Sequence, residues 1–416
     1  MHSPTETPRR DEVPPPQGSL HSATELLKEL ISFPSVSSTS NVEINEFCAT
    51  KLTSLGFEIF RSHYVDVRRV PKANLVAVRR PRHPNKVSQG SGLAYFCHTD
   101  VVPAEQWVGA PTTGPRGDHA PDDNSLPGPF DAVVTDDRVY GRGACDMKGS
   151  LAAMLSAVAR VDPDDQTAPI WIVCTADEEV GFAGAKHLVG HCEGYRELVR
   201  TDPISIIGEP TEMNVVYAHK GINGFSIQSR GRAGHSATGY GTNANEAMVP
   251  MLVKLLELCQ RTRDDTTLKD DRFDPPDLSW NFGVSDHSHV VNITPERCDA
   301  WVSLRTMPEV DGRDLILEAN STADQLGLQF TMIDGCEPLW TDPKSDFVSQ
   351  FKSLAGTKSQ TVCYATDGGV LGVLTRRVVI GPGSIRQAHT VDEWIAIDQL
   401  SRGIECYEKS IRCWCT

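Results

Sequence analysis

The segments LAYFCHTD (93–100) and IWIVCTADEE (170–179) each begin with a short apolar run and end in histidine or acidic side chains. Between them, the apolar spacing of GSLAAMLSAVARV (149–161) predicts a helix. Two further segments, ISIIGEPT (204–211) and RRVVIGPGS (376–384), also carry apolar runs of strand length. Nearly continuous apolar strands that alternate with a helix predict an α/β fold with a mostly parallel sheet that is buried on both faces.

The middle of the chain follows a different pattern. Between about Ala218 and Met332, strand-like segments alternate with two helical ones, at 243–258 and 311–327. This pattern indicates a smaller α+β domain that is inserted into the larger one. We therefore predict a disordered tail at residues 1–20 and an inserted domain at 218–333. The larger domain would consist of two parts, at residues 21–217 and 334–416.

The composition is typical of a globular protein that acts on small molecules. The 416 residues suffice for two or three domains, and the formal net charge of −15 disfavours binding to nucleic acid. No apolar stretch reaches the roughly 18 residues that a membrane-spanning helix needs. The N-terminal segment lacks the apolar core of an export signal, and the 12 scattered cysteines favour reduced thiols. We therefore expect a cytoplasmic protein with neither a nucleic-acid nor a membrane partner.

Five side chains near the ends of the apolar segments form a candidate metal site. Because the carboxyl ends of parallel strands meet at one edge of a sheet, polar residues at those ends are expected to gather there. Two imidazoles and three carboxylates are ligands that suit Zn²⁺, Co²⁺ or Mn²⁺. One carboxylate can bridge two ions about 3.5–4 Å apart, and a short aspartate among glycines is the natural bridge. The candidates are His98, Asp146 (the bridge), Glu179, Glu209 and His389.

Two neighbouring carboxylates have candidate supporting roles. Asp100 follows His98 by two residues, so on a strand the two share a face, and Asp100 can accept the second ring N–H of His98. Glu178 lies beside Glu179 in the sequence. If Glu179 turns toward the metal, Glu178 is free to act as the general base on a water molecule.

Each of these signals also has a simpler interpretation. An HxD pair arises by chance, two adjacent glutamates usually form a solvated turn, and a histidine beside a glycine-rich loop is usually a capping or surface residue. Cys97, Cys145 and Cys174 flank the candidate ligands and are interpreted as small core residues. His287 and His289 form an HxH pair in the inserted domain, where a local turn or a subunit contact is the expectation. The joint pattern of the five candidates favours the metal site.

Taken together, the motifs resemble those of the dinuclear zinc deacylases and aminopeptidase-like hydrolases. This family includes acetylornithine deacetylase, succinyl-diaminopimelate desuccinylase, aminoacylase and carboxypeptidase relatives. The resemblance extends from about Ser22 to the C-terminus and is closest to the acetylornithine deacetylase branch. The motifs that carry it are HTD (98–100), GRGACDMKG (141–149), ADEEVG (176–181), GEPT (208–211), AHKG (218–221), GRAGHSA (231–237) and GPGSIRQAHTVDE (381–393).

The resemblance implies a role for each matched residue of the larger, catalytic domain. One metal ion would be held by His98, Asp146 and Glu209. The other would be held by Asp146, Glu179 and His389. Glu178 would activate the attacking water and then protonate the leaving amine.

The resemblance also implies roles for the inserted domain, which would serve as a lid and as the contact of a homodimer. His235 would reach an active site across the dimer and help to stabilise the oxyanion. Arg305 would clamp the substrate carboxylate with its planar guanidinium. Asn292 would lie near the same pocket.

Two features depart from the family pattern. The loop over 109–128 is long and turn-rich, and we expect it at the surface near the mouth of the pocket. In YATDGGVLG (364–372), Asp367 stands where acetylornithine deacetylases carry a glutamate-containing stretch. We hypothesise that Asp367 attracts a cationic side chain such as that of ornithine. A loop-capping aspartate is the alternative.

These features predict an amidohydrolase that uses two divalent ions, Zn²⁺ or alternatively Co²⁺, to remove an N-acyl group from an amino acid. The expected substrate is N2-acetyl-L-ornithine, which would give L-ornithine and acetate in arginine biosynthesis. The alternatives within the family are a succinyl-diaminopimelate desuccinylase, an aminoacylase, an acetylcitrulline deacetylase and a metallo-dipeptidase. In a different functional class, the alternative is a non-catalytic relative that binds an amino-acid derivative.

Overall fold

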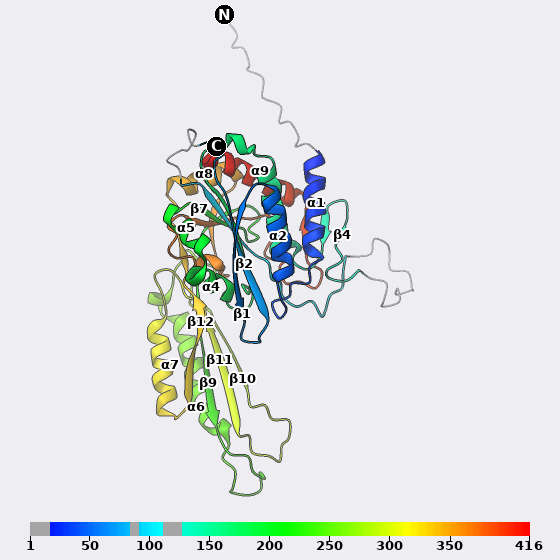
Figure 1. Cartoon of the computed structure of the whole chain (residues 1–416). Coiled ribbons are helices and arrows are strands. Elements are labelled where there is room, and N and C mark those ends of the chain that lie inside the picture. The colour runs from blue at the N-terminus through cyan, green and yellow to red at the C-terminus, as the bar shows by residue number, and fades with distance from the viewer. Residues whose placement is uncertain (1–16, 84–90, 111–126) are drawn as a thin grey trace, which may run out of the picture.

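The computed structural model describes residues 17–83, 91–110 and 127–416 (Figure 1). Most of the turn-rich loop predicted over 109–128 lies outside these ranges, as does most of the predicted N-terminal tail. Helix α1 begins at Gln17, so residues 17–20 are helical rather than part of a disordered tail.

The helices and strands are numbered in chain order. The helices are α1 (Gln17–Ile31), α2 (Val42–Ser54), α3 (Gly149–Ala159), α4 (Ala183–His191), α5 (Glu193–Thr201), α6 (Ala244–Asp264), α7 (Arg313–Gln325), α8 (Asp346–Ala355) and α9 (Ile397–Cys415). Within the described ranges, none of them is both long enough and apolar enough to span a lipid bilayer. The short helical turns are η2 (Ala144–Lys148), η3 (Pro163–Asp165), η4 (Thr266–Leu268) and η5 (Asp367–Gly369).

Within the described part of the chain, the strands form three sheets. They are β1 (Glu58–Val65), β2 (Pro71–Arg79), β3 (Leu93–His98), β4 (Val133–Val134), β5 (Arg138–Tyr140), β6 (Ile170–Thr175), β7 (Ile204–Ile207), β8 (Val215–His219), β9 (Ile222–Arg230), β10 (Trp280–Ser285), β11 (Arg297–Leu304), β12 (Gln329–Cys336), β13 (Leu339–Trp340), β14 (Ser359–Val362), β15 (Arg377–Val379) and β16 (Trp394–Ala396).

The largest sheet has the strand order β1-β2-β6-β3-β7-β15-β8-β13, with β14 paired to β8. The central strands β6, β3, β7 and β15 are parallel to one another. On either side, β1 and β2 and then β8 and β13 pair in antiparallel fashion. The predicted parallel sheet is therefore confirmed for the centre, which contains all four apolar segments, whereas the sheet as a whole is mixed.

Helices cover both faces of this sheet, as its apolar strands predict (Figure 1). Tyr95 and Cys97 of β3 belong to a core that also contains side chains from α1, α2, α3, α8 and α9. Their neighbours Ala94 and Phe96 belong to the opposite core, with side chains from α4 and α5. Because successive strand residues point to opposite faces, a strand between two cores has to be apolar throughout.

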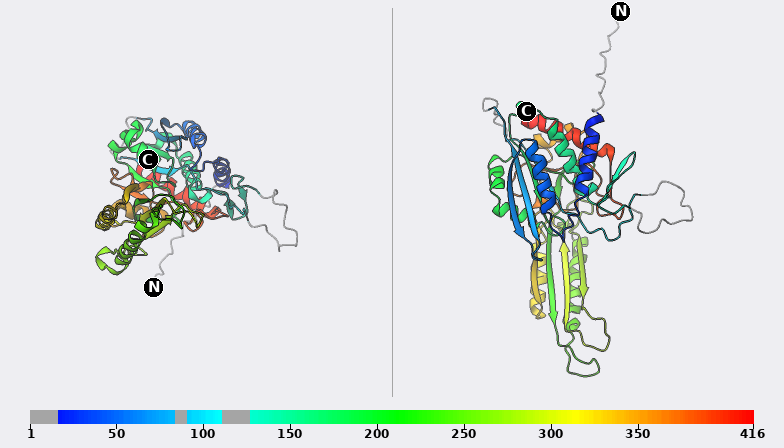
Figure 2. Two further views of the ribbon diagram at one scale, coloured as in Figure 1. Left: turned by 90° about the horizontal axis from the view of Figure 1, so that it is seen from below. Right: turned by 45° about the vertical axis from the view of Figure 1, so that its right-hand side comes forward.

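A second sheet, with the order β10-β11-β9-β12, forms a smaller unit. All its neighbouring strands are antiparallel, and α6 and α7 contribute to its core. Figure 2 shows this unit extending from one end of the larger one. Residues 218 and 219, which the sequence pattern assigned to the inserted domain, belong instead to β8 of the large sheet, and β12 continues to Cys336.

Candidate metal centre

The carboxyl ends of three parallel strands lead to one edge of the large sheet. His98 is the last residue of β3, Glu178 and Glu179 follow the end of β6, and Glu209 follows β7. His389 comes later in the chain, beyond β15, and has an Nε2 atom 3.1 Å from Oε1 of Glu179. The structure thus brings together side chains from four separate segments.

Asp146 lies between the two histidines. Its Oδ1 is 3.0 Å from Nε2 of His98, and its Oδ2 is 3.4 Å from Nε2 of His389. The turn into this loop passes through Gly143, which has a φ of 83° that glycine adopts without steric cost. Because its two oxygens face different imidazoles, Asp146 has the geometry of a ligand that two ions can share.

Asp100 supports the site in a different way from the one expected. Nδ1 of His98 is 2.9 Å from the backbone carbonyl oxygen of Asp100, whereas it is 3.8 Å from the carboxylate Oδ1. The carboxylate instead accepts the backbone N–H groups of Glu178 at 3.2 Å and Glu179 at 3.4 Å, and the hydroxyl of Ser37 at 2.7 Å. Asp100 therefore orients His98 through its main chain and holds the glutamate turn with its side chain.

Three glutamates complete the cluster. Oε2 of Glu179 is 3.0 Å from Nε2 of His389, and Oε1 of Glu209 is 3.7 Å from Nε2 of His98. The cluster is a potential metal site, because two groups of three possible ligands each have their ligand atoms within 4.8 Å of one another. These groups are His98, Asp146 and Glu179, and His98, Glu178 and Glu209.

Burial dominates the electrostatics of the cluster. It raises the pKa of Glu178 and of Glu209 well above the usual range, and neighbouring carboxylates add to the shift. On the exposed side, hydrogen bonds to Asp146 and Glu179 raise the pKa of His389 to about 10. Carboxylates that are crowded and buried in this way are costly to ionise without a cation. The oxygen and nitrogen donors therefore fit a divalent cation such as Zn²⁺, whose charge would remove the repulsion.

Glu393 and Arg142 form a buried support for the Asp146 loop that sequence reasoning missed. Oε1 of Glu393 accepts the backbone N–H groups of Cys145 at 2.9 Å and Asp146 at 3.0 Å, and Oε2 accepts Nη1–H of Arg142 at 2.7 Å. The pairing of β16 with β5 brings Glu393 to this place. A signal was available, since Glu393 ends the same motif that carries His389.

Arg305 and Asp367, both expected in the substrate pocket, have different environments. Arg305 follows β11, and burial lowers its pKa while the charge of Glu178 opposes that shift. Asp367 is only 3% exposed, and its Oδ2 accepts the hydroxyl of Thr175 at 2.5 Å. Burial raises the pKa of Asp367 to about 6. Both residues are therefore near the cluster, Arg305 on the side of the smaller unit and Asp367 within the larger one, where its charge adds to the raised pKa of Glu178.

His235 and Asn292 lie apart from the cluster. Both are exposed, and the backbone N–H of Ser236 donates to the carbonyl oxygen of Asn292 at 3.1 Å. They belong to the loops after β9 and β10, at the end of the smaller sheet that points away from the large one (Figure 2). Within one chain, the structure therefore brings these two residues to each other and not to the metal cluster.

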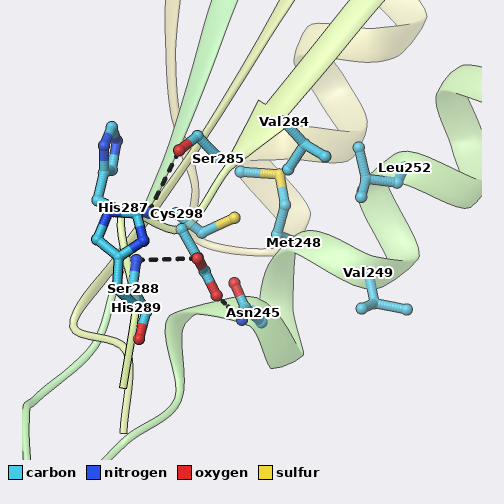
Figure 3. A pocket seen from close by; sticks show the side chains of 11 residues that line it. Asn245, Met248, Val249, Leu252, Val284, Ser285, His287, Ser288, His289 and Cys298 are labelled. Carbon is cyan, nitrogen blue, oxygen red and sulfur yellow. Dashed lines mark hydrogen bonds between the residues drawn. The ribbon is translucent and has the colours of Figure 1, made fainter. Parts of the chain in front are cut away.

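A separate pocket lies in the smaller unit between α6 and β10 (Figure 3). Met248 and Leu252 of α6 line it, and so do both histidines of the HxH pair, His287 and His289. Nε2 of His287 is 2.7 Å from Oδ2 of Asp299. The HxH pair thus belongs to an exposed loop of the smaller unit. The cysteines beside the candidate ligands are buried and carry free thiols.

Comparison with known proteins places these observations in a family. The family described as Peptidase family M20/M25/M40 matches residues 94–412, which is more than half of the chain. The protein named acetylornithine deacetylase from Proteus mirabilis is 31% identical to this chain, over 89% of this chain and 91% of its own length.

Solved structures share the fold at lower identity. A tripeptidase from Staphylococcus aureus has a TM-score of 0.68 at 17% identity and covers 95% of this chain and 98% of its own. Human carnosine dipeptidase 1 has a TM-score of 0.67 at 15% identity and covers 94% of this chain and 95% of its own. These likenesses agree with the α/β fold described above, and the match over 94–412 shows that the chain belongs to Peptidase family M20/M25/M40 and is a hydrolase of amide bonds.

Proposed function

We propose that this protein removes an N-acyl group from an amino acid, with N2-acetyl-L-ornithine as its substrate and L-ornithine and acetate as its products. The observation that carries the proposal is Asp146, whose two carboxylate oxygens face His98 and His389 at 3.0 and 3.4 Å. The 31% identity to the acetylornithine deacetylase of Proteus mirabilis supports the choice of substrate. The reaction would be a step of arginine biosynthesis.

The proposed cofactors are two divalent cations, with Zn²⁺ preferred and Co²⁺ as the alternative. In this proposal His98, Asp146 and Glu209 hold one ion, and Asp146, Glu179 and His389 hold the other. The crowding of buried carboxylates supports the presence of cations. When bound, the pair would polarise the amide carbonyl and lower the pKa of a water molecule.

Glu178 is the proposed general base and then the general acid. Its buried position raises its pKa, which makes the carboxylate a better acceptor for the proton of the attacking water. The same group can then deliver that proton to the leaving nitrogen. Asp100 fixes the backbone of Glu178, and Arg305 would hold the substrate carboxylate with its planar guanidinium. His235 of a second copy would stabilise the oxyanion.

A substrate panel tests this function. It contains N-acetyl and N-succinyl amino acids and dipeptides, each assayed with added Zn²⁺, with added Co²⁺ and with a chelator. We expect the highest kcat/KM for N2-acetyl-L-ornithine and loss of turnover with the chelator. The proposed substrate would be wrong if the enzyme preferred another compound of the panel. That compound could be N-succinyl-diaminopimelate, acetylcitrulline, a neutral N-acetyl amino acid or a dipeptide. No turnover of any compound would favour a non-catalytic binding protein.

Asp367 is proposed to favour a cationic substrate side chain. Because its carboxylate is buried, it would act through its charge at a distance and not through a direct contact. Asp367→Asn is expected to lower kcat/KM for N2-acetyl-L-ornithine roughly fivefold relative to N-acetyl-L-methionine. Thr175→Val is the control for the hydrogen bond at 2.5 Å, which it removes. Because that hydrogen bond lowers the pKa of Asp367, this variant is compared with wild type at alkaline pH, where the carboxylate keeps its charge. If the ratio of the two kcat/KM values were unchanged in Asp367→Asn, the only role left for Asp367 would be to hold its loop in place.

A homodimer through the smaller unit is also proposed. Within the described residues, β10 is an edge strand of its sheet, so one side of its backbone is available for pairing with a second chain. On α6, Val249, Val253 and Leu256 are 56%, 62% and 57% exposed and share one helical face. This apolar face adjoins the pocket of Figure 3. The partner proposed for this apolar face is a second copy of this chain, which would also supply His235 to the metal cluster.

Val253→Asp is expected to convert the dimer to a monomer in light scattering, because it places a charge on the proposed apolar interface. Activity should fall with the dimer, since the partner's oxyanion donor is lost. Leu317→Asp on α7, which alters an equally exposed aliphatic residue (58%), should leave both properties unchanged. A wild-type protein that is monomeric and fully active would refute the dimer.

A cytoplasmic location is proposed as well. All 12 cysteines carry free thiols, which suits a reducing compartment. The net charge of −15 supports a small-molecule partner and not nucleic acid.

A further inference from the structure

A buried polar network lies directly behind the glutamate turn. Tyr64 of β1 and Lys72 of β2 are register partners in an antiparallel pair, and both reach Asp177, the residue before Glu178. The hydroxyl of Tyr64 donates to Oδ2 of Asp177 at 2.6 Å, and Nζ–H of Lys72 donates to Oδ1 at 2.5 Å. Both carboxylate oxygens of Asp177 are therefore bound by the same pair of strands.

The ammonium group of Lys72 is fully enclosed. Its side chain is 0% exposed, and Nζ also donates to the backbone carbonyl oxygens of Ser37 at 2.7 Å and Thr39 at 2.9 Å. The hydroxyl of Ser37 in turn donates to the carboxylate of Asp100 at 2.7 Å. Because an unpaired buried charge is very costly, this full set of acceptors keeps Lys72 in place. The network thus joins Asp177 to Asp100, which binds the other side of the turn.

The backbone of Asp177 explains why the turn needs this support. Its φ of 54° lies in the left-handed region, which is sterically unfavourable for a residue with a side chain. Such a conformation persists where the surrounding contacts over-determine it. The carbonyl oxygen of Asp177 accepts the N–H of Phe182 at 2.9 Å, so this left-handed residue begins the turn that carries Glu178.

We propose that Tyr64 and Lys72 are positioning residues. Acting through Asp177, they hold the turn in the conformation in which Glu178 reaches the attacking water. The inference rests on the proposed function, in which Glu178 is the general base. Since a misplacement of about 1 Å can cost a catalytic group about 10²-fold in rate, a looser turn lowers kcat and leaves substrate binding unchanged.

Tyr64→Phe tests the inference with little disturbance, because it removes one hydroxyl and keeps the ring, whose centroid is 4.8 Å from that of His187. We expect kcat to fall roughly tenfold, with unchanged KM and zinc content. Hydrogen exchange at the backbone amides of the turn should become faster. Tyr407→Phe is the matched control, since its buried hydroxyl donates to the carbonyl oxygen of Ile380 at 2.9 Å. It should keep the wild-type kcat even where Tm falls.

Asp177→Asn and the double variant complete a mutant cycle. If Tyr64 acts through Asp177, the double variant is no slower than Asp177→Asn alone. A wild-type kcat in Tyr64→Phe would overturn the inference, and so would an equal loss of kcat in Tyr407→Phe. It would also be overturned if the rate loss of the double variant were the product of the losses in Tyr64→Phe and Asp177→Asn. Lys72→Met also lowers stability, because it leaves the Asp177 carboxylate buried without its cation, so Tyr64→Phe is the more selective variant.

The outcome stays distinct from that of the proposed function. Each rate is a ratio to wild type on whichever substrate of the panel the wild type cleaves fastest, so a substrate other than N2-acetyl-L-ornithine does not affect the test. The exchange measurement needs no substrate. Failure of the proposed function appears in the wild type, whereas failure of the inference appears as unchanged exchange and unchanged kcat in Tyr64→Phe.

Discussion

Replacement of Glu178 by glutamine is expected to lower kcat about 10²–10⁴-fold, the range that general acid–base catalysis contributes. The zinc content per chain should stay at the wild-type value. Glutamine preserves the size of this buried side chain, which is 9% exposed, but it cannot take up the proton of the attacking water. The measurement combines steady-state hydrolysis with elemental analysis of the same preparation.

Glu212→Gln is the control for this variant. Glu212 is an exposed glutamate three residues beyond Glu209, and its replacement should change neither kcat nor zinc content. A Glu178→Gln enzyme with wild-type kcat would remove Glu178 as the base. Loss of zinc from Glu178→Gln would instead make Glu178 a ligand, since its carboxylate lies within 4.8 Å of ligand atoms of His98 and Glu209.

Replacement of Asp146 by alanine is expected to remove at least one zinc ion per chain and to lower kcat roughly 10³-fold or more. Metal polarisation contributes several kcal/mol to such reactions, and about 4 kcal/mol corresponds to 10³-fold in rate. The reason is specific to this side chain, because its two oxygens are the atoms that face His98 and His389. Elemental analysis and kinetics on the purified variant check both parts.

Asp202→Asn is the control for the Asp146 variant. Asp202 is a half-buried carboxylate that accepts hydrogen bonds from Thr375, outside the cluster, and its replacement should leave zinc content and kcat unchanged. Full zinc content in Asp146→Ala would show that the ions are held without the shared carboxylate.

The position of the cluster could be predicted because it follows from strand direction alone. His98, Glu179 and Glu209 each stand at or just beyond the end of a buried apolar strand, and parallel strands end at the same edge of a sheet. Only the central strands had to be parallel for this argument. Apolar patterns do not distinguish the antiparallel outer strands from parallel ones. The outer strands do not change the edge of the sheet at which the central strands end.

Contacts that depend on the path of the backbone could not be predicted. Strand β3 ends at His98, so the alternation that placed His98 and Asp100 on one face stops before Asp100. The carbonyl of Asp100 therefore approaches the imidazole, and its carboxylate turns to the glutamate turn. Glu393 reaches Asp146 only through the pairing of β16 with β5, a long-range contact that no local pattern reveals.

The distance of His235 and Asn292 from the metal cluster could not be predicted for the same reason, because it also depends on the path of the backbone. Their motifs are local, but their position at the far end of the smaller sheet depends on the lengths and directions of β9 and β10. A role at the metal cluster then requires a second chain.

Zinc-edge anomalous diffraction from crystals grown with Zn²⁺ asks whether two cations share Asp146. We expect two peaks about 3.5–4 Å apart, one beside His98 and one beside His389, with the carboxylate of Asp146 between them. A single peak, or peaks remote from Asp146, in crystals of a preparation that still hydrolyses its substrate would refute the shared-aspartate centre.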